Sequence, residues 1–174
     1  MSKSRTLLFS TIFLIVVLLV GIRFFYSKNE GSQAVPVLRS LPVFSVQRID
    51  ESMISSSEFL SNSQFVVHIW GTWCAPCITE MPVLLDTARL PSNSQTKYYL
   101  IAVNDELKLI RKFIAKYSLP SNVEVLFDVN NVVMDKFGTF KVPESFIFKA
   151  GINKAKLVGP QDWDKVNLNS LYFN

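Results

Sequence analysis

The two cysteines of the chain, Cys74 and Cys77, are spaced C-x-x-C within the stretch WGTWCAPC at residues 70–77. An apolar run at residues 65–70 leads into them, and apolar residues recur at helical spacing over residues 78–85. These patterns predict a strand that turns directly into a helix, with Cys74 at the helix N-terminus. Unpaired N–H groups and the helix dipole favour negative charge there, so we expect Cys74 to be a thiolate nucleophile near neutral pH.

Other roles for the two cysteines are two inert thiols, a structural disulfide or half of a zinc site. Zinc sites usually have four ligands, and this chain has no further cysteine and a single histidine, His68. Pro76, between the cysteines, fits the first turn of a helix, where N–H groups have no intrahelical partner to lose. A C-x-x-C pair beside a strand–helix–strand pattern is typical of a redox site. Met53, Met81 and Met134 are scattered and are expected in the core, not around a copper ion.

The N-terminal region is expected to be a membrane anchor. Residues 7–22 carry no charge, and residues 7–26 would form about 30 Å of helix, enough to span a bilayer. Lys3 and Arg5 precede this run, which favours a cytoplasmic N-terminus and an extracytoplasmic domain. The alternative is a cleaved signal peptide ending near Ala34, but bulky aromatic residues intervene.

The remainder of the chain is expected to form one domain. The predicted organisation is an anchor at residues 1–26, a polar tether at 27–40 and an α/β domain at 41–174. The net charge of +4 is spread along the chain without a basic stripe, so no nucleic-acid partner is expected. Two cysteines in one motif leave none for a disulfide framework.

Periodicity and capping signals predict strands that alternate with helices around a central mixed sheet. The predicted strands are an edge strand at 41–49, then 65–70, 98–103 and 123–127, and an antiparallel pair at 145–148 and 154–158. The predicted helices are a short one capped at 55–58, the C-x-x-C helix to residue 88, one at 105–117 capped by Asn104, a short one stopped by Gly138, and a weak one at 163–172.

Three stretches of the sequence resemble the thioredoxin superfamily, and more closely its membrane-anchored TlpA/ResA/CcmG (DsbE-type) branch. They are residues 70–77, the Glu-Met-Pro at 80–82 and Val-Pro-Glu-Ser-Phe-Ile at 142–147. The resemblance implies a thioredoxin-like fold with helices on both faces of the sheet. It also implies that Pro143 is cis and lies against the C-x-x-C, and that Val142 presents its backbone to an extended substrate.

The resemblance also implies roles in disulfide exchange. Cys74 would attack, Cys77 would resolve the mixed disulfide, and Trp73 would flank the site. Glu80, on the same helix face as Cys77, would move protons to or from the thiols; the alternative is a solvated helix charge. His68 replaces the aspartate of plain thioredoxin and the amide common in this branch, so it is either part of the proton route or a satisfied core histidine.

The expected function is a thiol–disulfide oxidoreductase without a cofactor, anchored in a bacterial inner membrane with its domain facing the periplasm or extracytoplasmic space. By resemblance it would reduce protein disulfides, with electrons from a membrane thiol-transfer protein and apocytochrome c as one plausible substrate. The alternatives are a disulfide oxidase of the DsbA kind, a copper-handling module that uses both thiolates, and a non-catalytic binding domain.

Overall fold

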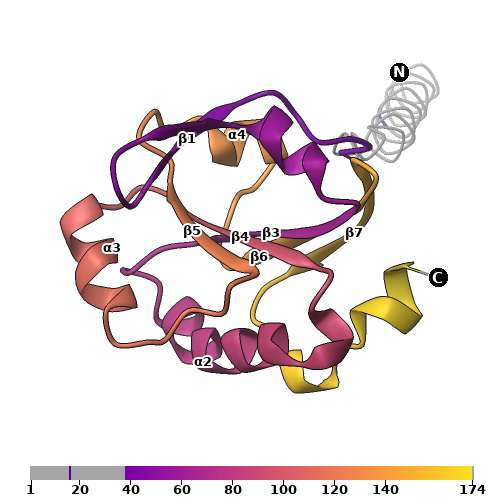
Figure 1. Cartoon of the computed structure of the whole chain (residues 1–174). Helices are drawn as coiled ribbons and strands as arrows, with labels where there is room; N and C mark the ends of the chain where they lie inside the picture. Colours follow the sequence, from indigo (N-terminus) through magenta and orange to yellow (C-terminus); the bar gives the residue numbers. More distant parts are fainter. Residues whose placement is uncertain (1–15, 17–37, 174) are drawn as a thin grey trace, which may run out of the picture. The chain divides into compact units, whose positions relative to one another are not determined.

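The computed structural model describes residue 16 and residues 38–173, and the latter lie in one compact unit (Figure 1). The predicted anchor, apart from Val16, and most of the predicted tether lie outside the described residues. Among the described residues, no helix has the length and apolar character that crossing a membrane would require.

A single seven-stranded mixed sheet forms the centre of the domain, in the order β2-β1-β5-β4-β3-β6-β7. The central strand β3 pairs in parallel with β4 and antiparallel with β6, as predicted for a mixed sheet. The prediction of an edge strand at 41–49 was wrong, because β2 pairs along the outer side of β1. The strands are β1 (Ser45–Arg48), β2 (Met53–Ser55), β3 (Gln64–Trp70), β4 (Lys97–Ala102), β5 (Val123–Phe127), β6 (Glu144–Lys149) and β7 (Ile152–Val158).

Helical segments cover both faces of the sheet, as expected (Figure 1). One face is covered by α2 (Ala75–Arg89), α3 (Leu107–Ile114) and the C-terminal segments η3 (Trp163–Lys165) and η4 (Asn169–Phe173). The other is covered by η1 (Ser56–Ser61) and α4 (Val133–Phe137). A short turn, η2 (Pro91–Asn93), follows α2.

Alternation along β3 divides the core into two clusters. Phe65, Val67 and Ile69 belong to the cluster beneath α4. Val66 and Trp70 belong to the cluster beneath α2, together with both cysteines. His68 has the same parity as Val66 and Trp70, so its ring lies on the α2 face of the sheet.

Local capping signals had mixed outcomes. Ser55 and Glu58 form the predicted capping box of η1, and Gly138 ends α4 in the left-handed conformation. Asn104, however, does not cap α3: it has a φ of 49°, and the N-cap is Glu106. The predicted terminal helix at 163–172 is also wrong, since the chain forms two short segments there, η3 and η4.

Candidate active site

The two cysteines form a disulfide at the start of α2. Cys74 is the N-cap residue and Cys77 is in the first turn, with their Cα atoms 5.3 Å apart. The Cys77 N–H donates to Cys74 Sγ over 3.3 Å. Cys77 is fully buried, whereas Cys74 retains 5% exposure. A backbone donor and a helix N-terminus both stabilise negative charge on Cys74 once the disulfide is reduced.

The turn that precedes Cys74 is held by a carboxylate that the sequence did not single out. Asp105 accepts from Thr72 N over 2.6 Å through Oδ2, and from Thr72 Oγ1 over 2.8 Å through Oδ1. The Trp73 indole N–H donates to the Val103 carbonyl over 3.1 Å. A Cβ at Gly71 would lie 2.5 Å from that indole nitrogen, so only glycine fits there without displacing the ring.

The loop before β6 lies against the disulfide. The Val142–Pro143 peptide bond is cis, as the resemblance implied. Cys74 Sγ lies 3.7 Å from the Val142 carbonyl oxygen. The Pro143 carbonyl accepts from Gly159 N over 2.9 Å, which ties the loop to the end of β7.

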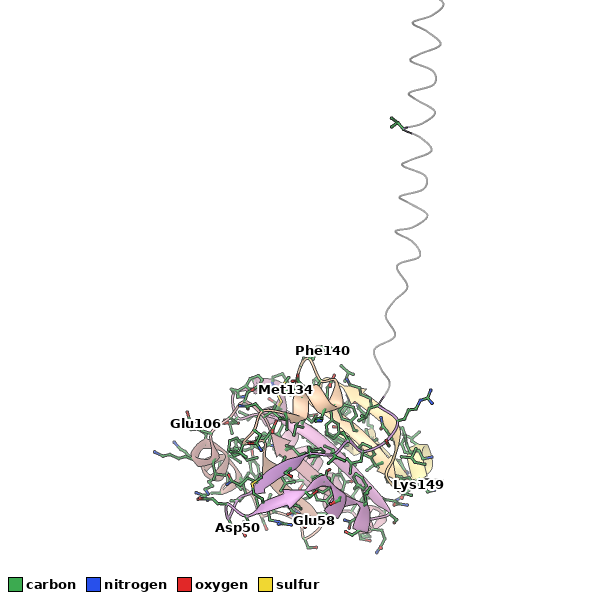
Figure 2. All side chains as sticks on the ribbon, turned by 90° about the horizontal axis from the view of Figure 1, so that it is seen from above. Asp50, Glu58, Glu106, Met134, Phe140 and Lys149 are labelled. Carbon is green, nitrogen blue, oxygen red and sulfur yellow. A yellow bond between two sulfur atoms is a disulfide. The ribbon has the colours of Figure 1, made fainter. Side chains whose placement is uncertain are left out.

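Two aromatic side chains, one directly before Cys74 and one in the segment that leads to the cis-proline loop, are open to solvent. Trp73, directly before Cys74, is 56% exposed. Phe140, two residues before Val142, is 80% exposed and lies at the outer edge of the domain (Figure 2). No sequence motif marks Phe140.

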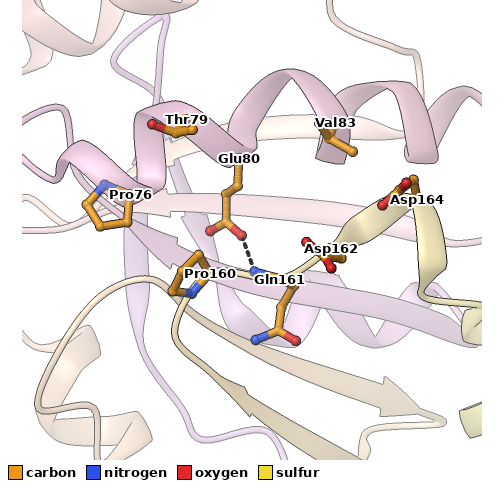
Figure 3. A pocket seen from close by; sticks show the side chains of 8 residues that line it. All are labelled: Pro76, Thr79, Glu80, Val83, Pro160, Gln161, Asp162 and Asp164. Carbon is orange, nitrogen blue, oxygen red and sulfur yellow. Dashed lines mark hydrogen bonds between the residues drawn. The ribbon is translucent and has the colours of Figure 1, made fainter.

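Glu80 is buried at 6% exposure, which excludes the solvated-charge alternative. Its Oε2 accepts from Gln161 N over 2.8 Å (Figure 3). The same oxygen accepts from Trp163 Nε1 over 3.1 Å. Burial raises the pKa of Glu80, and these two hydrogen bonds oppose the rise. Neither partner is marked by a local sequence pattern, which predicted only a weak helix from residue 163 onward.

His68 is fully buried and lies between β6 and α2. Its Nδ1 is 2.8 Å from Ser145 Oγ, and its Nε2 is 3.6 Å from Glu80 Oε1. Burial lowers the pKa of His68 to about 3, so the ring is neutral at physiological pH. The structure thus brings together two residues that the sequence had named separately.

Two further features of the site are its lack of a metal-binding group among the described residues and a hollow beside α2. Within residues 38–173 and at residue 16, no group of three or more His, Cys, Asp or Glu side chains is arranged to hold a metal ion. A hollow of about 500 Å³ opens beside α2 and reaches Glu80; Pro76, Val83, Pro160 and Asp164 are among its lining residues (Figure 3).

The fold and the site together define a thioredoxin-like thiol–disulfide oxidoreductase. The sequence profile of the AhpC/TSA family matches residues 37–154, and the chain belongs to this family. The thiol-disulfide oxidoreductase ResA of Bacillus thuringiensis is 26% identical over 149 residues, which cover 84% of this chain and 83% of that protein.

Two further similarities agree with this class. ResA of Bacillus subtilis is 22% identical over 159 residues, covering 91% of this chain and 87% of its own length. A secreted Mycobacterium tuberculosis disulfide oxidoreductase, homologous to E. coli DsbE, superposes with a TM-score of 0.61 at 20% identity. The superposition covers 70% of this chain and 90% of the other, and it supports the fold.

Proposed function

We propose that this protein is a membrane-tethered, extracytoplasmic reductase of protein disulfides that acts through Cys74 and Cys77. The observation that carries the proposal is the Cys74–Cys77 pair at the N-terminus of α2, with Cys74 Sγ 3.7 Å from the backbone of the cis-proline loop. The relatives named thiol-disulfide oxidoreductase support the reaction class. The reductive direction and the partners rest on the sequence resemblance, and the anchor rests on the uncharged apolar run at residues 7–22.

The reaction begins with the reduced dithiol. The Cys74 thiolate attacks one sulfur of a substrate disulfide, and the other substrate sulfur leaves as a thiolate. Cys77 then gives up its proton and attacks Cys74 Sγ, which releases the second substrate thiolate and forms the Cys74–Cys77 disulfide. Two electrons have passed from the dithiol to the substrate, and a membrane thiol-transfer protein returns them by the same exchange in reverse.

Glu80 carries the proton in this scheme. It is buried one helical turn beyond Cys77, and burial raises its pKa above that of an exposed carboxylate, which makes it a stronger base toward the Cys77 thiol. The hollow that reaches Glu80 gives water access to it (Figure 3). Glu80 therefore takes the proton of Cys77 and passes it to solvent.

Substrate is held at the cis-proline loop. The Val142 backbone offers polar groups to an extended segment beside Cys74, and Pro143 fixes that loop. Trp73 covers one side of the disulfide, and its exposed ring gives the segment an apolar contact. Maturation of c-type cytochromes would supply a substrate of this kind, a polypeptide with a C-x-x-C disulfide.

Trapping of the mixed disulfide tests the chemistry. Cys77→Ala should leave a long-lived mixed disulfide between Cys74 and a disulfide-containing peptide, visible on a non-reducing gel. Cys74→Ala should abolish exchange and is the matched control. If Cys77→Ala turns over like wild type, or if Cys77 is alkylated by iodoacetamide before Cys74, the assigned roles are wrong.

Direction and topology need separate measurements. The Cys74–Cys77 potential, measured against a glutathione series, decides between a reductase near −270 mV and a DsbA-like oxidase near −120 mV, both approximate values. Alkaline carbonate washing of membranes should leave the full chain in the pellet. Recovery of a soluble form that begins near residue 35 would instead establish a cleaved signal peptide.

A further inference from the structure

Two buried polar atoms beneath α2 face each other without a hydrogen-bond partner among the described residues: Nε2 of His68 and Oε1 of Glu80. They are 3.6 Å apart, slightly beyond hydrogen-bond range, and a small side-chain rotation closes that gap. Buried polar atoms are paired in the great majority of cases. Each atom is therefore the natural partner of the other, provided that one of them carries a hydrogen.

The hydrogen-bonding of Glu80 determines where its proton can sit. Oε2 already accepts two N–H groups, from Gln161 and Trp163. An oxygen with two donors has no room for a proton of its own. When Glu80 is neutral, its proton is therefore on Oε1 and points at His68.

The position of His68 follows from the sheet register. His68 and Ser145 are directly opposite each other on the antiparallel strands β3 and β6, so their side chains share the α2 face. The Ser145 hydroxyl, 2.8 Å from Nδ1, can either donate or accept. The ring hydrogen of a neutral His68 can thus reside on either nitrogen while the bond to Ser145 is kept.

Building on the proposed role of Glu80, we propose that His68 and Ser145 form a tautomeric relay that holds Glu80 in both of its protonation states. With Glu80 neutral, Oε1–H donates to Nε2, and Nδ1–H donates to Ser145 Oγ. With Glu80 ionised, Nε2–H donates to Oε1, and Ser145 Oγ–H donates to Nδ1. On ionisation the Oε1 hydrogen passes to Nε2, the Nδ1 hydrogen passes to Ser145 Oγ, and the original hydroxyl hydrogen of Ser145 is the proton that the unit loses, so the ring carries one hydrogen in both states.

The relay avoids a buried imidazolium, since the ring remains neutral throughout. The groups around the His68 ring are consistent with a neutral ring. β4 presents Leu100 beside His68, and Trp163 packs edge-on against the ring, with centroids 6.1 Å apart. The other charged groups at the hollow are Asp162, paired with Lys165 at 2.8 Å, and Asp164. Cys77, on α2, belongs to the buried cluster beneath that helix, which also contains Trp163.

The relay makes His68 a positioning residue that acts through Glu80. A hydrogen bond from Nε2–H to a carboxylate is charge-assisted and stronger than one between neutral groups. His68 therefore favours ionised Glu80, the form that takes the proton of Cys77. Replacing the ring by an apolar side chain should slow the resolving step about tenfold near pH 7.

The test uses the fact that the chain has one histidine. Selective ¹⁵N-histidine labelling of the full chain in detergent, purified without a polyhistidine tag, gives the NMR spectrum of His68 alone. Between pH 4 and 9 we expect a change from the Nδ1–H to the Nε2–H tautomer, with no imidazolium. Glu80→Gln should abolish this change, and Ser145→Ala should reduce the Nδ1–H population at low pH. One unchanging tautomer in wild type, or an imidazolium near neutral pH, overturns the relay.

Kinetics supply the second readout. His68→Leu should slow single-turnover resolution about tenfold, and His68→Gln, whose amide can donate to or accept from Glu80, should restore most of the rate. Equal rates for both variants contradict the relay. The tautomer is measured on the oxidised protein and needs no substrate, so failure of the relay is distinguishable from failure of the Cys77→Ala trap, which concerns the proposed function.

Discussion

At the scale of single residues, the two cysteine sulfur atoms lie in different surroundings. Cys74 caps α2 and is in contact with a backbone N–H, whereas Cys77 has no exposed surface. A thiolate is stabilised at the first position and disfavoured at the second. The difference accounts for an attacking and a resolving cysteine, and it leaves Cys77 in need of a base.

Glu80→Gln should slow the resolving step by about 10²–10⁴-fold, the usual contribution of a general base. Glutamine keeps an oxygen for the donors of Gln161 and Trp163, so the packing is retained while the basic group is lost. Single-turnover resolution of a Cys74 mixed disulfide from pH 5 to 9 measures the effect. His68→Asn, which removes only the relay, should have a milder effect; the reverse order would make histidine the base.

Asp105→Ala should loosen the turn before Cys74, because Thr72 N–H and Thr72 Oγ lose their acceptor. We expect a loss of about 1–3 kcal/mol in the free energy of unfolding, measured by urea titration. The neighbouring Glu106 is exposed and its side chain makes no cap bond, so Glu106→Ala is the matched control and should change little. Equal losses in both variants would show that the hydrogen bonds from Thr72 to Asp105 do not contribute to the free energy of unfolding.

At the scale of elements, the parts that were predicted correctly are those with strong local signals. The strands β3, β4 and β5 are apolar runs, and α2 has regular apolar spacing, so their burial follows from the sequence. Asp105 has the pattern of a first-turn acid, and only the tertiary contact with Thr72 reveals its role. Trp163 is not part of a periodic apolar pattern in the sequence. Its position beneath α2 depends on tertiary packing, which a local pattern does not encode.

Trp163→Phe tests how the η3 segment acts on α2. The aromatic ring is kept while one of the two donors to Glu80 is lost, so the pKa of Glu80 should rise further. The pH profile of the resolving step should then shift to higher pH. Gln161 reaches Glu80 through its backbone N–H, so Gln161→Ala is the control and should keep the wild-type profile. Identical pH profiles for wild type and Trp163→Phe would show that the Trp163 hydrogen bond does not affect the pKa of Glu80.

At the scale of the whole molecule, the two faces of the sheet differ in chemistry. The face beneath α4 is built from aromatic packing, such as the stacked rings of Phe59 and Tyr99 with centroids 3.7 Å apart. The face beneath α2 buries His68, Glu80 and Cys77 among apolar residues. His68 and Glu80, whose pKa values are both shifted by burial, lie on the face that carries the disulfide, and they make the stability of the domain depend on pH.

His68 and Glu80 act on stability from opposite ends of the pH scale. Burial lowers the pKa of His68 to about 3, whereas an unfolded histidine titrates near ~6.5. Between these values only the unfolded chain takes up the proton, so wild-type stability should fall as the pH is lowered from about 6.5. The pKa of Glu80 is raised, so the unfolded chain ionises first and stability falls as the pH rises above about 4.3.

Single variants should separate the two effects. His68→Asn should remove the acid branch, so its free energy of unfolding relative to wild type should improve by up to about 1.4 kcal/mol for each pH unit below 6. Glu80→Gln should instead gain on wild type as the pH rises from 4 to 8. Urea titrations of the full chain in detergent at pH 4, 5, 6, 7 and 8 measure both differences. Curves that stay parallel to wild type at every pH would mean that neither group is held in its neutral form by the fold.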